Sequence, residues 1–410
     1  MNTARVMQLR WRLTGFVYIS CSLFLLFQGG KTSFMLFVIL NVLIVYLVMG
    51  KWSGIGFVKG TRQLSGTGGA NDGVLAAGSR LDVKIDLKIP GFWPLPYVLV
   101  HDRLERRGAQ SMQFEVSFIP DIRRQGRVEY STPPLQRGRY TYLETECVTR
   151  DIFGLFEHTG RFDSPSSFTV LPQTVPIRAW SELQRGLKGP YSHAASARAA
   201  KETTQINGVR EYLNGDRLSR VHWNATAKTG EWKSKEFERE SVPRTVVVLD
   251  RCGSAYAKPD QFELAVSVTA SLLEHGLRRE TAMGLVSVGA TADGFQPRAT
   301  AEQRKLVLNH LVDVAADGSA GLYRSLRQAS VLLAPGSFVV LVTPHVGEEV
   351  ASAMQWLERK GMTPSLIHLP AGDGAVPDGG WHKQLRARGW QTYNVGRLQD
   401  LPGVLEGGAS

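Results

Sequence analysis

The segment Thr245-Val246-Val247-Val248-Leu249-Asp250 decides the fold of the C-terminal half of the chain. Its β-branched and apolar residues follow one another without polar alternation, which is typical of a strand buried on both faces of a parallel sheet. Helical and strand-like patterns alternate after it. The expected helices are 262–278, 302–314, 322–333 and 346–360, and the expected strands are 282–288, 337–342, 365–369 and 391–395. This alternation predicts an α/β doubly wound sheet with helices on both faces.

The segment directly upstream, Gly208–Trp232, reads GVREYLNGDRLSRVHWNATAKTGEW. Asn214-Gly215 is a turn signal, and Asp216 stands where a helix N-cap accepts bonds from free backbone N–H groups. We therefore expect a helix after Asp216 that ends at Thr229-Gly230. The highly charged residues 231–240 that follow are expected to form an edge strand or an exposed ribbon.

Three functional interpretations of this segment stay open. They are an acid–base pair of Asp216 and His222, an anion site formed by Arg210, Arg217 and Arg220, and ligand stacking on Tyr212 and Trp223. The structural interpretation, which we favour, is that Arg210 and Arg220 pair with acids and Trp223 covers the sheet. Residues 210–240 contain seven basic and six acidic side chains, a balance that disfavours binding to a nucleic-acid backbone. No nucleophile stands at a spacing that would complete a catalytic pair, so we expect no enzymatic activity.

Residues 81–180 carry a different pattern. Leu81–Ile89 alternates apolar and polar residues with a period of two, as a half-buried strand does. Further short strands are expected at 112–119, 139–148 and 167–171. Prolines and glycines separate them, so the pattern predicts a β-sandwich-like domain. The residues before it, 61–80, are rich in Gly, Ser and Thr and are expected to be a linker, and residues 181–207 are expected to be a connector.

Two apolar runs, Leu13–Gln28 and Phe34–Met49, flank a short polar break at Gly29–Ser33. With its flanks, each run approaches the ~20 residues that a helix needs to cross a bilayer. We therefore expect a two-helix transmembrane hairpin over residues 1–60, with Asn41 bonding across it. A signal peptide is the alternative, but no small-residue cleavage site follows and a second apolar run comes at once.

The position of the charge agrees with this expectation. The formal net charge is +11, and most of the excess lies in the first 80 residues, beside the apolar runs. Arginines precede the first run and Lys51, Lys59 and Arg62 follow the second, whereas the break between the runs contains only Lys31. The positive-inside rule then places both termini and the soluble domains in the cytoplasm. The small number of cysteines, three in all, fits a reducing compartment.

A family signature is recognisable in the segment upstream of the sheet. The residues that carry it are Arg210, Tyr212, Gly215, Asp216, Arg220, His222 and Trp223. Together with KEFERE at 235–240, the segment closely resembles the bacterial domain-of-unknown-function 58 family. RGRY at 137–140 and RDIFGLF at 150–156 are similar to the family too, although Ile152 stands where the family typically has proline.

This resemblance implies a multi-pass protein of the bacterial plasma (inner) membrane that works with a MoxR-type AAA+ ATPase. It also implies that residues 208–410 combine the family motif with a von Willebrand factor A-like α/β domain. The biochemical activity of the family is not established, so the resemblance implies an architecture more than a mechanism.

The resemblance further implies a place for a divalent cation. Von Willebrand factor A domains bind one through D-x-S-x-S after the first strand, with a threonine and an aspartate from later loops. Asp250 and Ser254 match this pattern, but Cys252 replaces the first serine, and a thiol is a poor ligand for Mg²⁺. Thr343-Pro344 stands where an acidic ligand is expected. We expect weak Mg²⁺ binding at most, with Asp250 fixing the turn or capping the next helix.

The expected function is that of a non-enzymatic, membrane-anchored adaptor or scaffold that works with a MoxR-type AAA+ ATPase at the cytoplasmic face. The chain contains no G-x-x-x-x-G-K-[ST] phosphate loop, so ATP-dependent work has to come from another chain. The alternatives are a hydrolase-type enzyme that uses Asp216 and His222, and an anionic-lipid binder. We expect no nucleic-acid partner and no certain cofactor.

Overall fold

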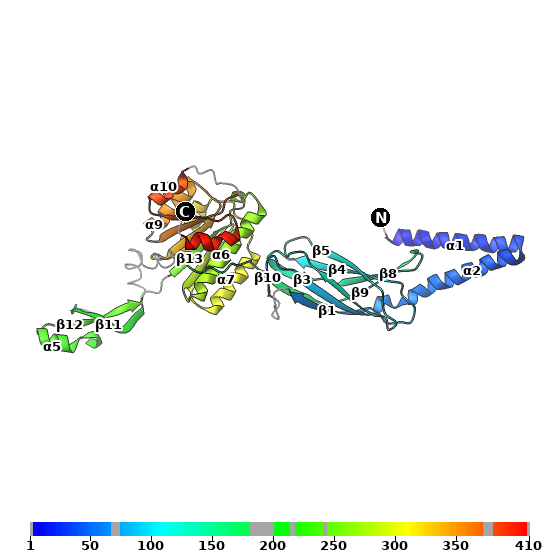
Figure 1. Cartoon of the computed structure of the whole chain (residues 1–410), viewed down its shortest axis with the longest axis horizontal. Coiled ribbons are helices and arrows are strands. Elements are labelled where there is room, and N and C mark those ends of the chain that lie inside the picture. Colours follow the sequence, from blue (N-terminus) through cyan, green and yellow to red (C-terminus); the bar gives the residue numbers. More distant parts are fainter. Residues whose placement is uncertain are drawn as a thin grey trace. The chain divides into compact units, whose positions relative to one another are not determined.

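The computed structural model of the chain describes residues 3–66, 74–180, 201–213, 218–240, 244–371 and 380–407. The chain divides into two compact units, Met1–Leu171 and Pro172–Ser410. The first contains the N-terminal helices and the β-rich domain, and the second contains the α/β sheet and a two-stranded ribbon (Figure 1). Each unit is described by itself.

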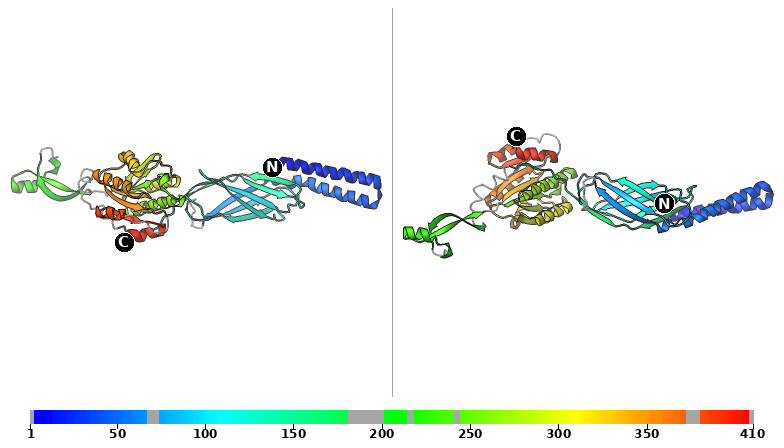
Figure 2. Two further views of the ribbon diagram at one scale, coloured as in Figure 1. Left: turned by 90° about the horizontal axis from the view of Figure 1, so that it is seen from above. Right: turned by 60° about the horizontal axis from the view of Figure 1, so that its bottom comes forward.

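The N-terminal helices are α1 (Thr3–Gln28) and α2 (Gly30–Met49), and α2 returns alongside α1 (Figure 2). The reversal takes place at Gly29 and Gly30, whose φ angles of 57° and 91° are open to glycine but strained for other residues. The rings of Tyr18 and Phe37 then meet with their centroids 5.9 Å apart. The expected five-residue break is therefore too long, because two glycines suffice to turn the chain.

We had expected Asn41 to bond across the two helices, but it bonds within its own helix. Its side-chain amide donates to the carbonyl oxygen of Phe37, one turn earlier in α2, at 2.8 Å. Among the described residues, Gly30–Met49 is the one helix long and apolar enough to cross a membrane, and Arg12–Gln28 is a shorter apolar helix. At a rise of about 1.5 Å per residue, α2 matches the ~30 Å thickness of a bilayer core.

The β-rich domain consists of two sheets that share one apolar core. The first has the order β1-β3-β6, with β1 (Lys59–Gly66), β3 (Leu81–Lys88) and β6 (Gln125–Ser131). The second has the order β2-β10-β7-β4-β8-β9, and β5 pairs with β4. Its strands are β2 (Val74–Ala76), β4 (Val98–Arg106), β5 (Met112–Phe118), β7 (Gly138–Tyr142), β8 (Thr145–Arg150), β9 (Glu157–Phe162) and β10 (Ser166–Leu171).

Two expectations for this domain are wrong. Most of the supposed linker at 61–80 that the structure describes is strand, because β1 pairs with β3 over eight residues, from Lys59↔Lys88 to Gly66↔Leu81. The single strand expected at 139–148 is two strands, β7 and β8, that pair with different stretches of β4. In both places, pairing with neighbouring strands determines the secondary structure, and the local composition does not predict it.

A buried ion pair joins the two sheets. Arg62 on β1 donates from Nη2 to Oδ1 of Asp102 on β4 at 2.7 Å, and neither side chain is more than 1% exposed. Thr145 and Tyr130 also donate to this carboxylate, at 3.0 and 2.6 Å. The guanidinium carbon of Arg62 lies 4.1 Å from the ring centroid of Tyr142. Burial, together with the neighbouring Asp102 carboxylate, raises the pKa of Tyr130, so its hydroxyl keeps its proton.

The second unit is built on a six-stranded sheet with the order β15-β14-β13-β16-β17-β18. The strands are β13 (Arg244–Asp250), β14 (Ala282–Val288), β15 (Ala292–Arg298), β16 (Phe338–Thr343), β17 (Thr363–His368) and β18 (Gln391–Asn394). All neighbours are parallel except β14 and β15. The expected strands are confirmed, whereas β15, which contains Gly294 and Pro297, was missed.

Helices cover both faces of this sheet (Figure 1). Val247 and Leu249 of β13 pack in one core with α6 (Pro259–Arg278), α7 (Ala301–Asp313) and α11 (Leu401–Glu406). Val246 and Val248 pack in the other core with α8 (Leu322–Gln328), α9 (Glu348–Arg359) and α10 (Trp381–Ala387). This division explains why the decisive strand is apolar at successive positions, since both of its faces are buried.

Residues 172–180 belong to this unit. We had expected them to be part of the β-rich domain, over residues 81–180. Ile177 and Trp180 are buried in the core with α6. The backbone N–H of Val175 donates to Ser271 Oγ at 3.1 Å, and His275 Nδ1 lies 2.8 Å from the carbonyl oxygen of Ile177. Of the expected connector, residues 181–200 lie outside the described residues, and the rest belongs to strand β11 (Lys201–Glu211).

The ribbon consists of β11 paired antiparallel with β12 (Lys233–Glu240), which confirms the ribbon expected at 231–240. Between the strands lie a short turn of 3₁₀ helix, η3 (Leu218–Arg220), and helix α5 (Trp223–Thr229). The ribbon and α5 form one segment, which is drawn in green in both views of Figure 2.

Candidate functional site

The carboxyl edge of the six-stranded sheet gathers polar residues from separate strands. Asp250 ends β13 and Thr343 ends β16, and the parallel register brings them together. Thr343 donates from Oγ1 to Asp250 Oδ2 at 2.6 Å, and the backbone N–H of Cys252 donates to Oδ1 at 2.9 Å. The placement fits the general rule that ligands of doubly wound sheets bind beyond the carboxyl ends of the strands.

Two further titratable side chains, those of His345 and Glu349, lie at this edge. His345 Nε2 lies 3.5 Å from Asp250 Oδ2, and His345 Nδ1 lies 3.4 Å from Glu349 Oε2. The i, i+4 spacing of His345 and Glu349 at the start of α9 was the signal that could have found them. The result is an Asp250–His345–Glu349 chain of titratable groups.

The Asp250 carboxylate is 1% exposed, and burial raises its pKa against the opposing effect of the Thr343 hydrogen bond. Among the described residues no lysine or arginine lies within ion-pair distance of the Asp250 carboxylate. His345 is the one side chain near it that becomes positively charged when it binds a proton. The neighbouring Arg251 points elsewhere: it binds Asp293 at 3.1 Å and Asp317 at 2.6 Å. Asp250 therefore fixes the turn, as expected, but it does so as a buried acid without a permanent cation.

The residues present at this edge do not fit a magnesium site. Both Asp250 oxygens already accept hydrogen bonds, and Ser254 Oγ lies 3.3 Å from Cys252 Sγ. Within the described parts of the chain, no three histidine, cysteine, aspartate or glutamate side chains are grouped so that they could hold a metal. Mg²⁺ prefers several hard oxygen ligands in near-octahedral geometry, which this thiol-containing arrangement does not offer.

The family motif forms a surface on the ribbon that we call the aromatic tip, made of Tyr212, Trp223 and Trp232. The ring centroids of Tyr212 and Trp232 are 5.5 Å apart, and those of Trp223 and Trp232 are 6.1 Å apart. Trp223 is 61% exposed and Trp232 is 51% exposed. We had expected Trp223 to cover the sheet, but its ring contacts Trp232 within the ribbon instead, at an interplanar angle of 57°.

Backbone hydrogen bonds hold the aromatic tip in place. The Tyr212 N–H donates to the Trp232 carbonyl oxygen at 2.9 Å, and the His222 N–H donates to the Lys233 carbonyl oxygen at 2.8 Å. Val221 forms a bridge with Ser234, and both residues are buried. Leu213 and Leu218 beside them are exposed, so the tip combines a fixed backbone with open apolar side chains.

His222 caps helix α5. Its Nδ1 accepts a hydrogen bond from the backbone N–H of Ala225 at 3.2 Å, and α5 ends at Gly230 in the left-handed conformation with φ of 73°. The expected end at Thr229-Gly230 is confirmed, but the helix begins later than expected. Gly215 and Asp216 fall in 214–217, outside the described residues, so their expected roles stay predictions. With Nδ1 accepting, the neutral ring carries its proton on Nε2.

Of the three arginines of the motif, Arg210 and Arg220 lie within the described residues. Arg210 donates from Nη1 to the carbonyl oxygen of Glu211 at 2.9 Å, and Arg220 is half-buried at the end of η3. Arg217 lies outside the described residues. Lys233 lies 3.7 Å from Glu211 and 3.4 Å from Glu231, so opposite charges alternate on the ribbon.

Comparisons with known proteins agree with the resemblance seen in the sequence. The family model "Protein of unknown function DUF58" matches residues 208–381. The chain is 26% identical over 333 residues to "Uncharacterized protein YeaD" of Bacillus subtilis, a match that covers 78% of each chain.

Solved structures give only distant similarities. Proximal thread matrix protein 1 from the mussel byssus is 14% identical with a TM-score of 0.30, over 40% of this chain and 46% of that one, so less than half of that protein is matched. The CARDB domain of the PF1109 protein from Pyrococcus furiosus is 15% identical with a TM-score of 0.17, over 28% of this chain and 89% of that one. Neither similarity carries an argument. The motif on the ribbon, the family match over 208–381 and the YeaD alignment all support a DUF58 family protein.

Proposed function

We propose that this protein is a membrane-anchored, non-enzymatic adaptor that crosses the bacterial inner membrane twice and presents the aromatic tip to a MoxR-type AAA+ ATPase at the cytoplasmic face. The observation that carries the proposal is the exposure of Trp223 and Trp232, at 61% and 51%, within the family motif. Tryptophan is among the residues most enriched at the energetic centres of protein interfaces.

The arrangement of the motif supports an interface more than a catalytic centre. His222 uses Nδ1 to cap α5, and a ring nitrogen occupied in this way is not free to act as a base. Val221 and Ser234 anchor the base of the tip while its aromatic rings face solvent. A rigid backbone that carries exposed rings lowers the entropy cost of binding.

The remaining parts supply the anchor and the scaffold. Helix α2 has the length and composition of a membrane span, and α1 adds a second, shorter apolar helix. The order β15-β14-β13-β16-β17-β18, with Asp250, Cys252 and Ser254 after β13, supports a von Willebrand factor A-like domain. With no phosphate loop in the sequence, nucleotide hydrolysis falls to the partner.

Co-purification of the ATPase from crosslinked membranes tests this proposal. Trp223→Ala and Trp232→Ala are expected to reduce recovery of the ATPase at least tenfold, because truncating an interface hot spot typically costs 2 kcal/mol or more. Trp223→Phe, which keeps an aromatic ring, should retain most of the recovery. Val331→Ala is the matched control, since Val331 is 90% exposed in the same unit but lies outside the ribbon.

Two results would contradict the proposal in different ways. Equal recovery with the wild type and both alanine variants would remove the aromatic tip as the contact. Absence of the ATPase from the crosslinked wild-type sample would remove the partner itself. A hydrolytic activity of the purified full chain that His222→Ala abolishes, with unchanged thermal unfolding, would favour the hydrolase alternative.

A further inference from the structure

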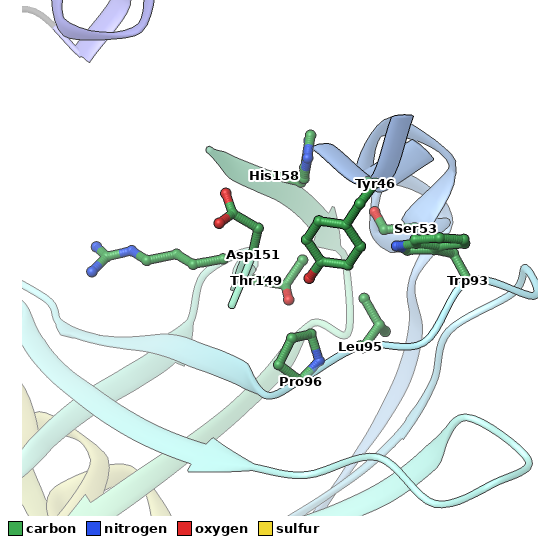
Figure 3. A pocket seen from close by; sticks show the side chains of 10 residues that line it. Tyr46, Ser53, Trp93, Leu95, Pro96, Thr149, Asp151 and His158 are labelled. Atoms are coloured by element: carbon green, nitrogen blue, oxygen red, sulfur yellow. The ribbon is translucent and has the colours of Figure 1, made fainter. Parts of the chain in front are cut away.

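One end of the first unit brings together chain segments that are far apart in sequence. Tyr46, in the last turn of α2, accepts a hydrogen bond on its hydroxyl from the Ile152 N–H at 3.3 Å. Its ring centroid lies 5.8 Å from that of Trp93 and 6.2 Å from that of Phe153. Figure 3 shows Tyr46 between Trp93 and the segment that contains Asp151. We call this the proximal end, because it directly follows α2.

The loop from 119 to 124 belongs to the same end. The Arg124 guanidinium donates to the carbonyl oxygen of Ser53, which follows α2 by four residues. The carbonyl oxygen of Arg124 accepts from the Ile89 N–H at 3.0 Å, which joins this loop to the chain that leads into Phe92 and Trp93. Three loops and the short segment after α2 therefore converge around the C-terminus of that helix.

Large apolar side chains point outward from these loops. Together with the segment after α2, seven of them are each at least 60% exposed: Trp52, Phe57, Phe92, Ile119, Ile122, Ile152 and Phe153. The opposite end differs, since the turn between β4 and β5 there reads RGAQS over residues 107–111. A soluble domain rarely exposes so many large apolar groups at one end unless that end is covered.

We propose that the proximal end is seated in the membrane interface, with its loops in contact with the headgroup and upper acyl region of the lipids. The proposal rests on the anchor in the proposed function. The chain is continuous from α2 into Trp52 and Phe57, so an embedded α2 would hold this end against the bilayer surface. Aromatic rings are enriched at that depth, and interfacial segments reach about 5–10 Å into it.

The hydrogen bonds of the loop at Asp151 suit a position in the membrane interface. The Asp151 carboxylate accepts hydrogen bonds from the backbone N–H groups of Phe153 at 2.8 Å, Leu155 at 3.2 Å and Phe156. Gly154, with φ of 65°, lets the loop reverse. Backbone donors that enter an apolar layer need partners, and this carboxylate provides them from within the loop. Ile152 and Phe153 can then meet lipid while the local donors stay satisfied.

Lipid quenching of a fluorophore at single introduced cysteines tests the proposal in the full chain. We would label Phe153→Cys and Ile122→Cys, reconstitute each into phosphatidylethanolamine–phosphatidylglycerol vesicles, and compare lipids with and without brominated acyl chains. Ala109→Cys, at the opposite end, is the matched control, and Val42→Cys, 65% exposed on α2, reports on the anchor. The native cysteines, Cys21, Cys147 and Cys252, are buried, so the unsubstituted chain gives the background labelling.

We expect brominated lipids to lower the emission at positions 153 and 122 at least twofold, with a larger loss at position 42 and no change at position 109. Quenching at 42 without quenching at 153 and 122 would overturn the inference and leave the anchor intact. No quenching at 42 would overturn the anchor and the inference with it. A probe at 153 that is shielded from water yet not quenched by lipid would show that protein, such as a second copy of the chain, covers this end.

Discussion

Asp102 and Asp250 are buried to the same extent, each 1% exposed, but their charges are balanced in different ways. Asp102, in the first unit, has the guanidinium of Arg62 at 2.7 Å and two hydroxyl donors. Asp250, in the second unit, has one hydroxyl, one backbone N–H and the imidazole of His345 at 3.5 Å. One carboxylate is paired with a permanent cation and the other is not.

This difference separates a structural ion pair from a group that can change its charge. Burial raises the pKa of Asp250, so ionising this carboxyl group lowers the free energy of unfolding. Arg62 joins two sheets, and its partner Asp102 also accepts hydrogen bonds from Thr145 and Tyr130. We conclude that the first acid holds two strands together and that the second marks the polar edge of the α/β sheet.

The largest expected effect is that of Arg62→Ala. Removing the guanidinium leaves Asp102 buried without its cation, which typically costs about 3–5 kcal/mol. Hydrogen exchange of the full chain in detergent should report this loss as a lower opening free energy in β3, β4 and β8. The double change Arg62→Leu with Asp102→Leu removes both charges and should restore much of the protection. A loss below about 1 kcal/mol for Arg62→Ala would place this pair with ordinary surface ion pairs.

Sequence reasoning named Arg62 only as a charge that flanks the second apolar run, and it missed both the buried ion pair and the strand that carries it. The reason is physical. β1 is rich in small and polar residues, so only its pairing with β3 and the burial of Arg62 identify it. The interior strands β13, β14 and β16 were predictable because both faces of each are apolar. β15 was missed because Pro297 and Gly294 are tolerated on an antiparallel edge strand but read as loop.

The candidate site was predictable to a similar degree. The family resemblance placed Asp250 and Thr343 at one site, and Thr343 does donate to the Asp250 carboxylate. Glu349 was not singled out, although the helix that carries it was expected at 346–360 and its i, i+4 spacing from His345 is visible in the sequence. At the ribbon, the cap of α5 is a histidine, a residue outside the common N-cap set of Ser, Thr, Asp and Asn, so the start of the helix was misplaced.

The second expected effect is a pH dependence due to His368, which ends β17 at the same sheet edge as Asp250. Burial lowers the pKa of His368 to about 4. The unfolded chain binds a proton on this residue near pH 6.5, so stability should fall as the pH drops from 6.5 to 4, by on the order of 3 kcal/mol. His368→Gln should flatten the dependence of the unfolding free energy on pH in that range. An unchanged slope would show that other groups account for it.

The third expected effect has the opposite sign. Because the pKa of Asp250 is raised in the folded state, its contribution is most favourable below the ordinary aspartate pKa and is lost as the pH rises through the folded-state value. Asp250→Asn keeps the size of the side chain and removes the charge. We therefore expect the variant to gain stability relative to the wild type at pH 7, and the gain to shrink toward pH 4. A variant that is less stable at pH 7 would mean that the carboxylate makes interactions that outweigh its burial.

The smallest expected effect is that of Lys84→Ala, in the same three-stranded sheet as Arg62. Lys84 Nζ lies 3.2 Å from Glu129 Oε1, and the two side chains are 43% and 54% exposed. Water and salt screen such a pair, which typically contributes about 0.2–1 kcal/mol. The opening free energy of β3 should therefore fall far less than with Arg62→Ala, although each change removes one partner of an ion pair and the two substituted residues lie on the neighbouring strands β1 and β3.

The two ion pairs should also differ in how strongly salt weakens their contribution to stability. At 1 M ionic strength the Debye length is about 3 Å, so the contribution of Lys84 should nearly vanish, whereas that of the buried Arg62 should change little. The two variants measured at low and high salt then give a direct comparison of burial, since the charges and the sheet are held constant. If Lys84→Ala cost as much as Arg62→Ala at high salt, burial would not be what distinguishes the two pairs, and the same explanation for Asp250 would fall with it.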